Sequence, residues 1–165
     1  MMNELMIFID GSVHAQSKIG FGASLGVSDI GLSLDVFATQ IKIKQFENTS
    51  STQLELQNFL WAINTIPILG RKVIVYTDSQ TIVRLPSRRE KLELNLYRSS
   101  QNIRLNQAEL YQAFYRTIDT VDCHFIKVKG HQKAQQKVIV DHIFSLVDRA
   151  SRQALRRYHQ QLTKD

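Results

Sequence analysis

Four acidic residues lie where an expected strand or helix would present them to a common site. Asp10 and Asp78 each follow an apolar, strand-like run, Glu55 lies in the first turn of a helical pattern, and Asp148 lies inside a long amphipathic one. Four carboxylates in one place would repel one another unless cations lay between them. Divalent ions such as Mg²⁺ prefer oxygen ligands, and two of them about 4 Å apart can activate water and hold a phosphate. The four acids together therefore favour a site with two divalent cations.

Each acid taken alone also has a simpler interpretation, which the residues leave open. Asp10 stands before Gly-Ser and could form a turn. The segment 52–55 has the Thr-x-x-Glu pattern of a capping box, and Asp78 could cap the next helix. Asp148 could be a solvated helix charge paired with Arg152, four residues later.

The elements that must position these acids begin with three strand-like segments. Residues 4–10 are apolar before Gly11-Ser12 breaks the run, and 20–27 and 33–44 carry β-branched and aromatic residues in rough alternation. Residues 28–31 supply a turn between the second and third segments. Three consecutive strands with short links predict an antiparallel meander.

The rest of the chain alternates helical and strand-like patterns. Pro67 and Pro86 are expected to end helices, because proline has no backbone N–H to donate. We expect a first helix that begins at 50–52 and stops at Pro67, further helices over 80–85, 105–118 and 139–162, and strands over 73–77 and 123–128. The order predicts an α/β fold with a five-stranded mixed sheet flanked by helices, in one domain over residues 1–165.

The charge of the chain favours a nucleic-acid partner. Lys and Arg number 21 against 15 Asp and Glu, for a formal charge of +6, and the pI is about 9.6. A pI above about 9 is a common property of nucleic-acid-binding domains. A local basic cluster follows the fourth expected strand and consists of Arg84, Arg88, Arg89 and Lys91. The alternative for this cluster is a solubilising loop.

Cysteine usage and hydropathy indicate the compartment. Cys123 is the only cysteine, so no intramolecular disulfide forms, and it is expected to be a small core residue. No stretch approaches the roughly 18 apolar residues of a membrane span, and the N-terminus lacks the pattern of a signal peptide. We therefore expect a cytoplasmic protein without membrane contact, and a monomer.

Five segments resemble the ribonuclease H family in type, order and spacing. They are IFIDGS (7–12), SSTQLELQNFLWAI (50–63), VIVYTDSQ (73–80), VKGH (128–131) and VDRASRQAL (147–155). Singly, DGS and TDSQ are common strings, but the ordered set of five is specific. The resemblance implies the ribonuclease H-like fold and a nuclease that cuts the RNA strand of RNA–DNA hybrids.

The resemblance also implies roles for individual residues. Asp10, Glu55, Asp78 and Asp148 match the metal-binding carboxylates, and His131 matches a histidine that helps proton transfer and product release. Gln80 matches a residue that contacts the minor groove, and the basic cluster matches the family's substrate handle. Contacts to the RNA 2′-hydroxyl would come from Gly11, Ser12, Ser51, Thr52 and Gln80.

These roles predict an endonuclease with two Mg²⁺ or Mn²⁺ ions that leaves 5′-phosphate and 3′-hydroxyl ends. Two alternatives remain, namely a related metal-dependent nuclease with another nucleic-acid substrate and a non-catalytic nucleic-acid-binding module on the same fold. The chain departs from the familiar pattern in its longer segment between His131 and Asp148, where Asp141 is a reserve metal ligand. It also has Ser51 and Thr52 in place of amides, and 12–20 in place of a Gly/Pro-rich loop.

Overall fold

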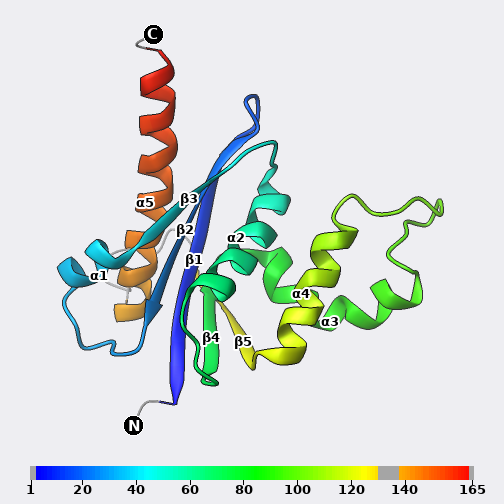
Figure 1. Ribbon diagram of the computed structural model, residues 1–165, viewed down its shortest axis with the longest axis horizontal. Coiled ribbons are helices and arrows are strands. Elements are labelled where there is room, and N and C mark those ends of the chain that lie inside the picture. Colours follow the sequence, from blue (N-terminus) through cyan, green and yellow to red (C-terminus); the bar gives the residue numbers. More distant parts are fainter. Residues whose placement is uncertain (1–2, 130–137, 164–165) are drawn as a thin grey trace.

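The computed structural model describes residues 3–129 and 138–163, which form an α/β structure (Figure 1). The elements follow in the order β1 (Glu4–His14), β2 (Ile19–Val27), α1 (Leu34–Gln40), β3 (Lys42–Phe46), α2 (Ser51–Thr65), β4 (Lys72–Thr77), α3 (Gln80–Leu94), α4 (Ala108–Thr120), β5 (Cys123–Lys127) and α5 (Ile139–Leu162). Within the described part of the chain, no helix is long and apolar enough to cross a membrane.

The five strands form one mixed sheet in the order β3-β2-β1-β4-β5. β1 to β3 pair antiparallel, whereas β4 runs parallel to both β1 and β5. This confirms the predicted mixed sheet with its first three strands antiparallel. Phe8 on β1 pairs with Tyr76 on β4, so Asp10 and Asp78, each two residues further on, reach the same edge of the sheet.

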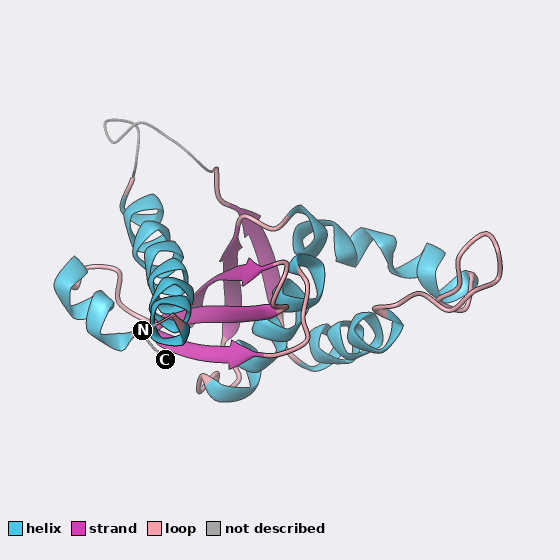
Figure 2. Ribbon diagram, turned by 90° about the horizontal axis from the view of Figure 1, so that it is seen from above, coloured by secondary structure: helices cyan, strands magenta, loops and turns pink. Residues whose placement is uncertain are grey.

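Helices cover both faces of this sheet (Figure 2). On one face, Leu5, Ile7 and Ile9 of β1 pack in a core with α2, α3 and α4. On the other face, Phe8 packs in a second core with α1 and α5. Successive strand residues point to opposite faces, so Asp10 and Ser12 share the α5 face with Phe8.

The prediction that Gly11-Ser12 ends the first strand was wrong, because β1 continues to His14. Gly11 pairs with Gly22 on β2, and a Cβ atom at Gly11 would lie only 2.9 Å from Leu54 of α2. Glycine here allows α2 to approach the sheet closely and does not interrupt the ladder. Asp10 therefore lies within a strand, which excludes the turn interpretation.

The prediction of a strand over 33–44 was also wrong. The predicted turn at 28–31 is confirmed, with the Asp29 carboxylate accepting from the Gly31 N–H at 2.9 Å. After it, however, a helix, α1, leads to a β3 that is shorter than predicted. The Ser33 hydroxyl accepts a hydrogen bond from the Val36 backbone N–H at 3.3 Å, which caps the helix. Phe37 is fully buried against the α5 face, so packing favours the helix over an extended strand.

The prediction that Pro86 ends the helix after β4 was wrong. α3 continues through Pro86 to Leu94, and Leu85 and Leu92 on its buried side pack into the core. A proline removes one helical hydrogen bond, and here burial of the flanking leucines outweighs that loss. α3 and α4 consequently form an arm that extends away from the sheet (Figure 1).

Candidate active site

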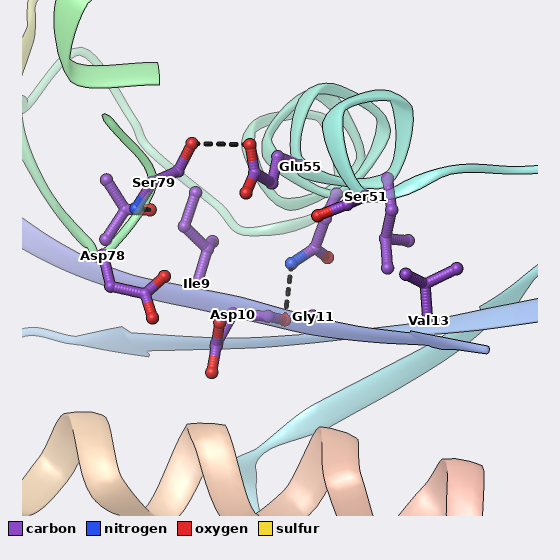
Figure 3. Close-up of a pocket in the computed structure, with 11 residues that line it drawn as sticks. Ile9, Asp10, Gly11, Val13, Ser51, Glu55, Asp78 and Ser79 are labelled. Carbon is purple, nitrogen blue, oxygen red and sulfur yellow. Dashed lines mark hydrogen bonds between the residues drawn. The ribbon is translucent and has the colours of Figure 1, made fainter. Parts of the chain in front are cut away.

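Asp10 and Asp78 lie side by side at the edge of the sheet where β4 ends (Figure 3). Burial of the Asp10 carboxyl, together with the nearby Asp148 and Asp78 carboxylates, raises its pKa to about 9. Burial and Asp148 also raise the pKa of Asp78, although Lys127 opposes this. Such mutual repulsion arises where several carboxylates converge.

Asp148 approaches Asp10 from α5, the helix that covers the face of the sheet to which Asp10 points. Its carboxylate accepts a hydrogen bond from Arg152, four residues later, as the helix-charge interpretation expects. The same carboxylate lies close enough to Asp10 and Asp78 to raise the pKa of both. Asp148 is therefore part of the acidic cluster as well as a partner of Arg152.

Glu55 faces the cluster from α2, on the other side of the sheet. Its Oε2 atom accepts a hydrogen bond of 2.7 Å from the Ser79 hydroxyl, and burial raises its pKa (Figure 3). The capping-box interpretation of Glu55 is wrong, because Ser50 caps α2 by accepting from the Gln53 N–H. The N-cap interpretation of Asp78 is wrong too, because Ser79 caps α3.

Two adjoining hollows connect the four acids. A cavity of about 230 Å³ on the α2 side is lined by Asp10, Glu55 and Asp78. A cleft of about 450 Å³ on the α5 side is lined by Asp10, Asp78 and Asp148. Asp10 and Asp78 border both hollows and so join them into one acidic site. Asp141, the reserve ligand, borders the second cleft, but its carboxylate accepts from the Val138 N–H at the start of α5.

The donor set of this site fits hard divalent cations. All four acids offer oxygen ligands, and their mutual repulsion would be relieved by positive charge. Among residues 3–129 and 138–163, no group of three His, Cys, Asp or Glu side chains is close enough to form a complete metal site.

Of the other residues predicted to contact the substrate, only some lie at this acidic site. Gly11 and Ser51 line the cavity, whereas Thr52 is half-buried on α2 outside its lining. Ser12 borders the α5-side cleft, with its hydroxyl bonded to Ser151. Gln80 begins α3, and its side-chain oxygen accepts from Lys127. His131 lies outside the described residues.

Only three residues of the basic cluster share one side of α3. Arg84, Arg88 and Lys91 are four and three residues apart and lie on the same side of the helix, whereas Arg89 does not. Arg89 turns toward α4, where it donates two hydrogen bonds to Asp119 at 2.6 and 2.9 Å. It donates a third to Glu93, four residues later on α3. Arg88 and Lys91 instead border a groove of about 620 Å³ further along the arm, and Arg84 is exposed on α3. Arg89 thus has a structural role, while the other three remain available to a ligand.

Sequence reasoning missed three residues at the site. Asn58 on α2 donates to the backbone oxygens of Asp10 and Ala23, at 2.9 and 3.1 Å. Ser151 and Lys127 contact predicted site residues, as described above. A polar Asn58 on a helix face shared with Leu54 and Ala62 was the one available signal.

The fold and the acidic edge define a class of protein that the comparisons identify. Residues 2–152 match the family model described as RNase H, so the chain belongs to the RNase H family. A search of curated proteins found no match to this chain.

Solved structures show the same fold at low sequence identity. The PFV RNase H domain in solution has a TM-score of 0.66 and 15% identity, with 90% of this chain and 92% of that chain covered. The native prototype foamy virus protease–reverse transcriptase has a TM-score of 0.68 and 16% identity over 90% of this chain, but this chain covers only 20% of that one. A foamy viral protease–reverse transcriptase in complex with dsDNA has a TM-score of 0.60 and 9% identity, with 84% and 90% covered.

Proposed function

We propose that this chain is an endonuclease that hydrolyses the RNA strand of RNA–DNA hybrids and leaves 5′-phosphate and 3′-hydroxyl ends. The observation that carries the proposal is the convergence of Asp10, Asp78 and Asp148, from three separate elements, at one edge of an RNase H-family sheet. Glu55 adjoins them across the α2-side cavity. A structural role for each acid separately would not bring them together against their own repulsion.

The four carboxylates would hold two Mg²⁺ or Mn²⁺ ions. When bound, such ions lower the pKa of a water and neutralise charge that develops on the phosphate. The protein's part is to place the ligands, and Ser79 contributes by holding the Glu55 carboxylate in one orientation. The Gly11 N–H, which is hydrogen-bonded to the Asp10 carboxyl, lowers its pKa and so favours the ionised form that a cation would bind. His131 would accept or donate a proton during turnover.

Recognition of the hybrid would combine contacts near the acids with charge along the arm. Gly11, Ser51 and Gln80 lie at or beside the acidic site, where they can reach the 2′-hydroxyl that distinguishes RNA from DNA. Arg88 and Lys91 border the groove on the arm and would contact phosphates.

A cleavage panel tests this substrate assignment. The full chain would be incubated with Mg²⁺ and end-labelled hybrid, duplex RNA, duplex DNA or single strands of the same sequence. The proposal predicts internal cuts in the RNA strand of the hybrid only. Cutting of duplex DNA or duplex RNA at a comparable rate would indicate a related nuclease, and binding of hybrid without any cutting would indicate a non-catalytic module.

A further inference from the structure

Two serines lie beside the Asp10–Asp148 pair on the same two elements, Ser12 on β1 and Ser151 on α5. Ser12 follows Asp10 by two residues on β1, so both side chains point to the same face of the sheet. Ser151 follows Asp148 by three residues on α5, so both lie on the same side of the helix. The two serine hydroxyls are 3.0 Å apart, which joins β1 directly to α5 beside the acids.

Ser151 also links this contact to Asp148 itself. Its side chain is completely buried, and its hydroxyl donates to the Asp148 backbone oxygen at 3.0 Å. Because that hydrogen is used within the helix, the Ser12 hydroxyl is the donor to Ser151. The chain of bonds runs from β1 to the backbone of Asp148.

The opposite side of β1 is fixed as well. Asn58 of α2 is only 2% exposed, and its amide donates to the backbone oxygens of Asp10 and Ala23. Gly22 makes room for it, since a Cβ atom at Gly22 would lie 2.3 Å from the Asn58 oxygen. β1 is therefore held from the α2 side, and the serine pair links it to α5 on the other side.

We propose that Ser12 and Ser151 are positioning residues that set the separation of the Asp10 and Asp148 carboxylates for binding divalent cations. The inference rests on the proposed function and assigns Ser12 to positioning in place of substrate contact. One buried hydrogen bond between a strand and a helix adds little net stability. Its geometric effect is larger, because it ties the turn of α5 that carries Asp148 to β1, beside a core of Phe8, Ile143 and Val147 that is apolar. Partners of metal ligands also tune metal affinity.

The test measures Mn²⁺ binding by isothermal titration calorimetry on the full chain. Ser151→Ala and Ser12→Ala should each raise the dissociation constant for Mn²⁺ by about tenfold, the lower end of the range for such partners. The double variant should bind no more weakly than either single variant, because both remove the same link. Hybrid cleavage by Ser151→Ala should recover at raised Mg²⁺, with an unchanged KM for the hybrid.

Thr117→Ala is the matched control. Thr117 donates its hydroxyl to the Ala113 backbone oxygen within α4, so the variant loses a comparable helix-backed hydroxyl away from the acids. It should bind Mn²⁺ as the parent does. If both serine variants also bind Mn²⁺ with the parental dissociation constant, the inference is overturned, even if their melting temperatures fall. If the parent itself binds no Mn²⁺, the proposed function fails and the inference fails with it.

Discussion

Replacing Asp10 by Asn should stabilise the folded chain in the absence of metal. The folded state raises the Asp10 pKa from 3.8 to about 9, so near pH 7 the carboxyl is protonated when folded and ionised when unfolded. The gap between 3.8 and pH 7 is about three pKa units, each worth about 1.4 kcal/mol, which places the cost of folding at up to about 4 kcal/mol. The raised pKa of Asp78 arises partly from the same buried acidic site, so the gain from Asn at Asp10 alone should be smaller.

The stability difference between Asp10→Asn and the parent should increase with pH. Below the unfolded pKa of 3.8 the carboxyl is protonated in both states, so Asp10→Asn should have little effect there. As the pH rises from 4 toward 9 the parent loses stability through this group, and the advantage of the variant should grow. Urea unfolding in EDTA at pH 4, 5.5, 7 and 8, followed by circular dichroism, measures the difference.

Asp119→Asn provides a control of opposite sign. Asp119 is an exposed acid whose pKa is lowered by its hydrogen bonds with Arg89, so its removal should destabilise the chain slightly at neutral pH. The reasoning would be refuted if Asp10→Asn were no more stable than the parent at pH 7, or if its advantage were largest at pH 4.

Three further predictions concern metal, turnover and substrate binding. Adding Mg²⁺ should raise the melting temperature of the parent but not of Asp10→Asn; equal shifts would place the ions elsewhere. His131→Ala should lower kcat while its Mn²⁺ titration stays parental, and an unchanged kcat would exclude a role in turnover. Lys127, which neighbours Asp78 and contacts Gln80, should contact a phosphate of the hybrid. Lys127→Gln should then reduce the slope of log affinity against log salt by about 1. Lys72 lies at the start of β4, away from the acids, and pairs with Glu4, so Lys72→Gln should leave the slope unchanged.

Local patterns were sufficient to predict much of the fold. The amphipathic repeat over 139–162 predicted α5 with its observed bounds, because an apolar stripe on a long helix has one obvious partner, the sheet. The apolar run over 73–77 likewise predicted β4, which begins one residue earlier. Asp10 and Asp78 could be expected at a common site because each follows a strand-like run, whereas the parallel pairing of those two strands is visible only in the structure.

The errors arose where a distant partner decides the local structure. Whether Gly11 ends or continues a strand depends on Gly22 and Leu54, which the local sequence does not reveal. The alternation around Phe37 fits a strand or a short helix, and only burial against the α5 face decides between them. The hydrogen bond from Ser79 to Glu55 joins residues 24 positions apart, so the capping-box pattern was the stronger local signal.

The most direct test of the account is cleavage of an RNA–DNA hybrid by the parent and by Asp10→Asn, both shown to be folded by circular dichroism. The parent should cut the RNA strand with Mg²⁺, leave 5′-phosphate and 3′-hydroxyl ends, and stop when EDTA is added. Asp10→Asn should cut at least a hundredfold more slowly, by analogy with the roughly 10²–10³-fold cost of losing one electrostatic group in an active site. Cutting by Asp10→Asn at the parental rate, or no cutting by the folded parent with Mg²⁺, would contradict a catalytic role for the acidic edge of this sheet.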